Sequence, residues 1–131
     1  MNTQEWLKVT QPKIHNYTNY TFQEIRPRVF CKDGFNISIQ ASKSHYSEPR
    51  EDDSKTYTKV ELGFPSSVHD LPEEIKQELI QYSDDYPELT TGTVYGYVPV
   101  ELVNRILEFH KGIYTYQDFY RNMISQLMEV K

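Results

Sequence analysis

The chain has 131 residues, of which 37% are hydrophobic, 25% charged and 14% aromatic, and this length predicts a single compact domain. Its 19 acidic and 14 basic side chains give a formal charge of −5. This balance disfavours bulk binding of DNA, because the chain lacks a global positive field. The single cysteine, Cys31, excludes an intrachain disulfide scaffold. No apolar run of about 18 residues occurs, so neither a membrane span nor a signal peptide is expected.

The first part of the chain is polar. Residues 1 to 22 are expected to form an ordered N-terminal extension, with a short helix around Trp6 and Leu7 that ends before Pro12. A core of sheet and helices is expected over residues 25 to 113, followed by a C-terminal helix.

Two runs of alternating apolar and polar residues flank Lys32-Asp33-Gly34 and predict a β-hairpin. A three-residue loop with Gly34 at positive φ keeps the two faces of the hairpin apart, and it pairs Val29 with Ile37. In this register the side chains expected to face the core are Ile25, Pro27, Val29, Cys31, Phe35, Ile37, Ile39 and Ala41. Those expected to face outward are Arg26, Arg28, Phe30, Ser38 and Gln40.

The middle of the chain predicts a loop, a strand and a helix. Residues 42 to 56 are polar and lack periodicity, which indicates an exposed loop. A strand is expected over residues 57 to 64, with Thr58, Val60, Leu62 and Phe64 facing the core. Asp70 is the expected N-cap of a helix that ends near residue 82, with Ile75 and Leu79 on its apolar face.

A further strand and helix complete the expected core. The strand covers residues 93 to 98, with Val94 and Val98 inward and Tyr95 and Tyr97 outward. Pro99 opens a helix that ends at Gly112, and its core-facing side chains are Val103, Ile106, Leu107 and His110.

The last segment, residues 115 to 131, has the clearest helical period in the chain, and Thr115 and Asp118 form a capping box before it. Its apolar stripe either covers the sheet or contacts a partner chain, and both interpretations stay open here. The expected fold class is α+β: an antiparallel sheet, helices packed against it, and a C-terminal amphipathic helix. The stripe consists of Tyr116, Phe119, Tyr120, Met123, Ile124, Leu127 and Met128.

Sequence motifs of known enzyme chemistry are missing. The chain has no HExxH, no glycine-rich phosphate loop and no GxSxG, and its four histidines lack the spacing of metal ligands. Cys31 is expected to face the core, where a free cysteine acts as a small hydrophobe. We therefore expect no enzymatic activity, no catalytic residue, no metal and no cofactor.

The outer face of the predicted sheet and the loop after its second strand hold residue types that suit a nucleotide. Guanidinium groups bind phosphate oxygens in bidentate fashion, and aromatic rings stack on bases. A solvated surface is the competing interpretation. The residues concerned are Arg26, Arg28, Phe30, Tyr95 and Tyr97 on the sheet, and Ser44, His45, Tyr46, Ser47 and Arg50 in the loop.

The strings RPRVFCKDGFNISIQASKSHYSEPR, YTKVELGFPS and TVYGYVPVELVNRILEFHKGI resemble the first Thoeris anti-defence family of small phage proteins. The resemblance covers about residues 25 to 113. It implies a sheet with helices, assembly as a dimer or a trimer of dimers, and binding of glycocyclic ADP-ribose without cleavage, in the cytoplasm of the host bacterium. Some members also bind cyclic oligonucleotides. The family often has Cys where Ser47 stands, which leaves the ligand preference open.

Together these observations predict a phage protein that sequesters a cyclic nucleotide and so blocks activation of the Thoeris effector. The alternatives are a cyclic-nucleotide hydrolase with His45 as general base, and an inhibitor that contacts a host immune enzyme through the C-terminal helix. The expected ligand-binding residues are Arg26, Arg28 and Arg50 for phosphate, Tyr95 and Tyr97 for stacking, His45 in the loop, and Asn104, Arg105 and Arg121 as pocket walls.

Overall fold

The computed structural model describes residues 1–129, except for the side chains of Phe22 and Gln23. The described chain has an α+β fold, as expected, with a four-stranded antiparallel sheet in the order β3-β4-β5-β6 and a separate two-stranded sheet of β1 and β2. Residues 130 and 131 of the expected C-terminal helix lie outside the described residues. The elements in chain order are α1 (Thr3–Val9), β1 (Ile14–Asn16), β2 (Thr21–Gln23), β3 (Val29–Phe30), β4 (Asn36–Gln40), β5 (Lys59–Gly63), α2 (Glu73–Ile80), β6 (Val94–Pro99), α3 (Val100–Phe109) and α4 (Tyr116–Glu129).

The hairpin of β3 and β4 has the predicted register. Val29 lies opposite Ile37. The Gly34 backbone N–H donates to the Cys31 carbonyl at 3.0 Å, and the Cys31 N–H donates to the Phe35 carbonyl at 2.8 Å. Gly34 has φ +96°, a conformation that costs glycine little because it has no Cβ. The three-residue loop is therefore confirmed.

The residues before β3 do not continue its alternation. Pro27 has no backbone N–H to donate to a ladder, and strand pairing begins only at Val29. Ile25 is 71% exposed, whereas Arg26 is 2% exposed. Gln40 is also buried, and its side chain bonds the backbone N and O of Arg26, both at 2.8 Å. The expectation that Ile25 faces the core and that Arg26 and Gln40 face solvent is wrong.

A β-bulge changes which side chains of β6 face the core. Val60 lies opposite Val98, but Leu62 lies opposite Tyr95, so β6 holds one extra residue between these pairs. Tyr97 in the bulge has φ +56°. Because an inserted residue reverses the alternation, Tyr95 and Val98 both face the core and are fully buried. The expectation that Tyr95 faces outward is wrong.

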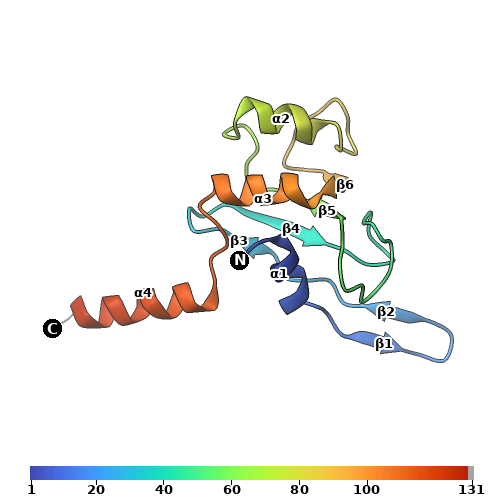
Figure 1. The fold of residues 1–131 in the computed structure, drawn as a ribbon, viewed down its shortest axis with the longest axis horizontal. Helices are drawn as coiled ribbons and strands as arrows, with labels where there is room; N and C mark the ends of the chain where they lie inside the picture. Colours follow the sequence, from blue (N-terminus) through green and yellow to red (C-terminus); the bar gives the residue numbers. More distant parts are fainter. Residues whose placement is uncertain (130–131) are drawn as a thin grey trace.

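α3 is the central helix of the layer that covers the sheet, and it contacts α1, α2 and β6 (Figure 1). Its expected core residues are confirmed. α2 begins at Glu73 with Pro72 as N-cap and no side-chain cap, so Asp70 does not cap it. The sheet ends also differ from expectation, since Phe64 is exposed and Tyr57 is buried. The core is built from Leu7 of α1, Val29, Ile37, Ile39, Val60, Leu62, Tyr95 and Val98 of the sheet, Ile75 and Leu79 of α2, and Leu102, Val103, Ile106 and Leu107 of α3.

Two elements extend away from this body: α4 on one side and the β1–β2 arm on the other (Figure 1). The Thr115–Asp118 capping box is confirmed, with the Thr115 N–H 2.8 Å from Asp118 Oδ2 and the Asp118 N–H 3.2 Å from Thr115 Oγ1. No residue of α4 is buried, so the interpretation in which this helix covers the sheet is wrong. Within the described residues, no helix has both the length and the apolar character needed to cross a membrane.

Candidate functional site

The loop after β4 lies against the bulge of β6. The Tyr97 backbone N–H donates to the Tyr46 carbonyl at 2.9 Å, and the Tyr46 N–H donates to Glu61 Oε1 at 3.3 Å. A Cβ on Gly96 would lie only 3.0 Å from Tyr46 Cβ, so any larger residue at this position would push Tyr46 back by a few tenths of an ångström. These contacts bring residues of a polar loop onto the strand next to Tyr97.

Three side chains gather there, and we call Tyr46, Arg50 and Tyr97 the aromatic platform. The ring centroids of Tyr46 and Tyr97 are 5.7 Å apart, and the Arg50 guanidinium carbon lies 5.1 Å from the Tyr46 centroid. Each tyrosine is 42% exposed. Arg50 Nε donates to the Lys43 carbonyl at 3.1 Å, and within the described chain its Nη groups have no hydrogen-bond or ion-pair partner. The platform therefore offers an aromatic surface and a free, oriented guanidinium edge.

Two lysine side chains near the platform are paired with carboxylates. Lys43 Nζ lies 3.7 Å from Asp52, and Lys59 Nζ lies 3.7 Å from Glu48. The Glu61 carboxylate, which accepts from the Tyr46 N–H, would repel an anion. An anionic ligand would consequently bind on the Arg50 side of the platform.

His45 is positioned by the loop itself. Its Nδ1 lies 2.6 Å from Ser42 Oγ. Burial lowers the pKa of His45 below its usual value of about 6.5, although the negative charge of Glu61 opposes this shift. His45 is therefore neutral at neutral pH, and it can contribute a hydrogen bond but no positive charge.

Arg26 has a structural role rather than a place on the outer face. Its Nη1 donates to the Ala41 carbonyl at 2.7 Å, and its Nη2 donates to the Leu7 carbonyl at 3.3 Å and to Gln11 Oε1 at 2.8 Å. Burial lowers the pKa of Arg26, an effect partly offset by the nearby Tyr57. These bonds hold α1 against the end of β4. Arg26 is therefore removed from the phosphate-binding candidates.

Tyr95, which was expected to stack on a base, is also removed from the candidate site. Its hydroxyl donates to the Thr90 carbonyl at 2.5 Å and accepts from the Thr90 N–H at 3.0 Å. Burial raises the pKa of this hydroxyl. Because the ring is fully buried, it offers no surface for a base and holds the loop before β6 instead.

Arg28 is partly buried and lies at the far end of β5 from the platform. Its Nε donates to Asn36 Oδ1 at 2.9 Å, and its Nη2 donates to the Phe64 carbonyl at 2.6 Å. Two of its five N–H donors are therefore used within the protein.

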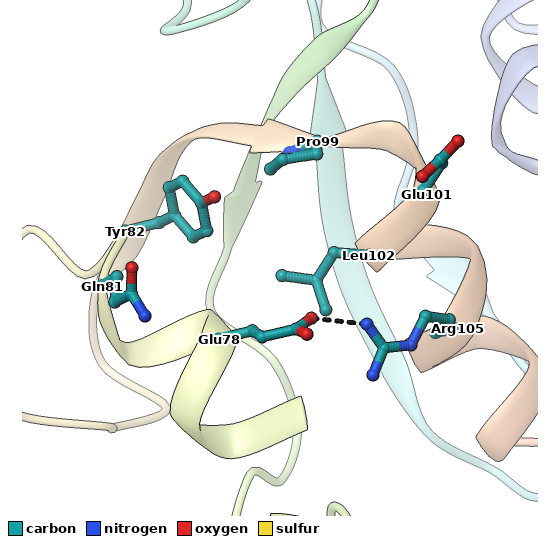
Figure 2. A pocket seen from close by; sticks show the side chains of 7 residues that line it. All are labelled: Glu78, Gln81, Tyr82, Pro99, Glu101, Leu102 and Arg105. Atoms are coloured by element: carbon teal, nitrogen blue, oxygen red, sulfur yellow. Dashed lines mark hydrogen bonds and ion pairs between the residues drawn. The ribbon is translucent and has the colours of Figure 1, made fainter. Parts of the chain in front are cut away.

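Arg105 lines a pocket of about 250 Å³ between α2 and α3 (Figure 2). Its guanidinium forms an ion pair with Glu78 across the pocket, close to Tyr82 and Leu102. Glu101 lies at the rim, so the two carboxylates outnumber the one cation. A phosphate group would be repelled here.

Asn104 and Arg121 lie in two further places. Asn104 Oδ1 accepts from the backbone N–H of Thr3 at 2.9 Å and from its hydroxyl at 2.5 Å, which docks α1 onto α3. Arg121, whose side chain is 77% exposed and 3.7 Å from Asp118, lines a pocket of about 320 Å³ beside Lys32 at the start of α4. The expected pocket walls thus belong to separate sites.

Of the sequence-predicted residues, Arg50 and Tyr97 each contact Tyr46, and His45 lies in the same loop as Arg50. Tyr46 is missing from the expected stacking residues, although it lies in the loop already singled out. An aromatic residue within the otherwise polar segment from 42 to 56 was the available signal. Its partner could not be identified, because the contact with Gly96 joins segments far apart in sequence.

Two further observations concern metal ligands and the single cysteine. Within residues 1–129, no group of three or more His, Cys, Asp or Glu side chains is placed to hold a metal ion. Burial, reinforced by the charge of Asp33, raises the pKa of Cys31 to about 11, so its reactive thiolate is scarce at neutral pH. Comparisons with protein-family models, curated proteins and solved structures find no match.

Proposed function

We propose that this protein binds a cyclic nucleotide of the ADP-ribose type and holds it without cleaving it, so that the ligand cannot activate a Thoeris effector in the cytoplasm of the host bacterium. The observation that carries the proposal is the aromatic platform: two exposed tyrosines beside a guanidinium whose Nη groups have no partner among the residues that the structure describes.

The chemistry of the platform matches the two halves of such a ligand. A base stacked on an exposed tyrosine gains about 1–3 kcal/mol. The Nη edge of Arg50 can bind two phosphate oxygens at once, which are the stronger, charge-assisted hydrogen bonds. The acidic net charge of the protein does not prevent this, since exposed charges beyond about 8 Å are largely screened at physiological salt.

A second part of the proposal concerns assembly. The exposed apolar stripe of α4 runs from Tyr116, 72% exposed, to Met128, 66% exposed. Contiguous apolar surface of this kind marks an interaction site, and we propose that a second copy of the chain covers it in a dimer or a trimer of dimers. We do not propose the edge strands β3 and β6 as the contact between copies, because other segments of the chain already bond to them. The Tyr114 backbone N–H donates to the Phe30 carbonyl of β3, and the Gly96 N–H of β6 donates to the Tyr82 carbonyl.

Calorimetry with glycocyclic ADP-ribose tests the ligand proposal, and heating the complex tests whether the ligand survives. Intact ligand in the heated supernatant is the expected result, whereas a linear product would identify a hydrolase. Absence of binding, together with capture of a host immune enzyme that Ile124→Lys abolishes, would favour the protein-interaction alternative.

Variants of the platform locate the site. Tyr46→Ala and Arg50→Ala should each weaken binding at least tenfold, because they remove the stacking ring and the phosphate-binding edge. Tyr46→Phe keeps the ring and should bind like the parent. Lys76→Ala removes one positive charge from α2, away from the platform, and serves as the charge control. Parental affinity in both alanine variants of the platform would refute this site.

A further inference from the structure

A carboxylate on the outer face of the sheet lies next to the bulge that carries part of the aromatic platform. β5 pairs with β6 on both sides of Glu61, at Val60 and at Leu62, and Gly96 and Tyr97 of the bulge lie between these pairs. Val60 and Leu62 are fully buried in the core. Because side chains alternate along a strand, Glu61 points to the opposite face, where the platform lies.

The same carboxylate contacts the other tyrosine of the platform. Glu61 Oε1 accepts from the Tyr46 backbone N–H at 3.3 Å, and the Tyr46 side chain lies against Gly96. The Glu61 side chain is partly buried, which restricts where its oxygens can go. Glu61 is therefore adjacent to both tyrosines of the platform.

Glu61 forms no ion pair with the described residues around it. Lys59, two residues away on the same face of β5, is paired with Glu48 at 3.7 Å. The charge of Glu61 acts to raise the pKa of His45, but burial of the ring has the larger effect and lowers this pKa, so His45 stays neutral at neutral pH. Among the described residues, Glu61 Oε2 has no hydrogen-bond partner. One oxygen of the carboxylate is consequently free to accept from a ligand.

Arg50 and Glu61 suit different groups of a ligand. The Nη groups of Arg50 donate, whereas an ionised carboxylate can only accept. Beside Glu61 a phosphate group would be repelled, but a hydroxyl group could donate to the carboxylate in a charge-assisted hydrogen bond. In a nucleotide, the hydroxyl groups belong to ribose, and an acidic side chain beside a nucleotide is well suited to bind them.

We propose that Glu61 determines the specificity of the aromatic platform, by accepting a hydrogen bond from a ribose hydroxyl of the ligand and by excluding ligands that carry a phosphate on that hydroxyl. The phosphates then lie on the Arg50 side and the sugar on the Glu61 side. Because a nucleotide must first occupy the platform, this role of Glu61 rests on the proposed function.

Calorimetry of Glu61→Gln with glycocyclic ADP-ribose tests the proposal. Glutamine has nearly the shape of glutamate and keeps an oxygen that can accept from the Tyr46 N–H, but it carries no charge. Loss of the charge-assisted bond should weaken binding at least tenfold. If Glu61 only repelled the anionic ligand, removal of its charge would tighten binding instead. Unchanged or tighter binding in Glu61→Gln would therefore overturn the proposal.

Inorganic pyrophosphate is the second probe, because it has the negative charge of the ligand but no hydroxyl. Its inhibition constant, measured by competition, should be lower for Glu61→Gln than for the parent, since only the repulsion is removed. Weaker binding of both probes would show that the substitution disturbs the whole platform, and this result would overturn the proposal. The matched control, Glu74→Gln, removes one negative charge from α2 and should keep the parental affinity for both probes.

Failure of the proposed function would give a different result from failure of this role. A parent protein that does not bind glycocyclic ADP-ribose would refute both. A parent that binds it, together with Glu61→Gln of equal affinity, would refute the role of Glu61 and leave the proposed function in place.

Discussion

Replacing Arg26 should damage the fold, although the local sequence pattern suggests an outward side chain. In Arg26→Ala, the carbonyls of Ala41 and Leu7 lose their donors, at 2.7 and 3.3 Å, and Gln11 Oε1 loses its donor at 2.8 Å. The site is almost sealed from water, because Arg26 is 2% exposed and Ala41 is fully buried. Each buried acceptor left without a partner costs about 1–3 kcal/mol.

Since the Leu7 bond is long and Gln11 can reorient, we expect a total loss of about 3–4 kcal/mol in the free energy of unfolding. This corresponds to a fall in melting temperature of about 10–15 °C for a domain of this size. Urea denaturation followed by the fluorescence of Trp6, the single tryptophan, measures the difference. Arg26→Lys keeps the charge but cannot reach all three acceptors, and its stability should lie between the two.

Arg50→Ala is the matched control, because this exposed arginine makes one hydrogen bond, to a backbone carbonyl, and its loss should change stability by less than about 0.5 kcal/mol. An Arg26→Ala protein within about 0.5 kcal/mol of the parent would refute the assignment of Arg26 as a structural residue.

Three further predictions concern the bulge, the C-terminal helix and pH. Gly96→Ala places a Cβ 3.0 Å from that of Tyr46, so it should cost about 1–3 kcal/mol of stability and weaken ligand binding, as thermal melting and calorimetry would show. Ile124→Lys should reduce the assembly toward the 15.6 kDa protomer in sedimentation without lowering the protomer's melting temperature, because Ile124 is 52% exposed; an unchanged sedimentation coefficient would count against the α4 contact. Burial acts to raise the pKa of Asp33, but hydrogen bonds to its two oxygens outweigh burial and lower it. Ionised Asp33 therefore stabilises the fold fully above its unfolded pKa of about 3.9, and this contribution is lost as pH falls through the folded pKa, so the stability difference between the parent and Asp33→Asn should shrink below about pH 4.

Features that depend on neighbouring residues could be predicted from the sequence. The register that pairs Val29 with Ile37 follows from the loop glycine and from the need to keep apolar side chains on one face. The same holds for the capping box at Thr115 and for the buried stripe of α3, because helix caps and the 3.6-residue period are properties of a single segment.

Of the candidate site, the sequence indicated the loop that carries Arg50 and the outward position of Tyr97, but not the contact of Tyr46 with Tyr97 that links this loop to the strand. That contact depends on Gly96, whose missing Cβ lets Tyr46 approach from a segment fifty residues earlier in the chain.

Only the tertiary structure decided which way Arg26 and Tyr95 face. Alternation predicts a face only while a strand stays in a regular ladder. Pro27 ends the ladder on one side, and the bulge of β6 shifts it by one residue on the other. Whether α4 packs on its own sheet or extends from it was equally undetermined, since an apolar helical stripe requires a partner surface but does not specify which one.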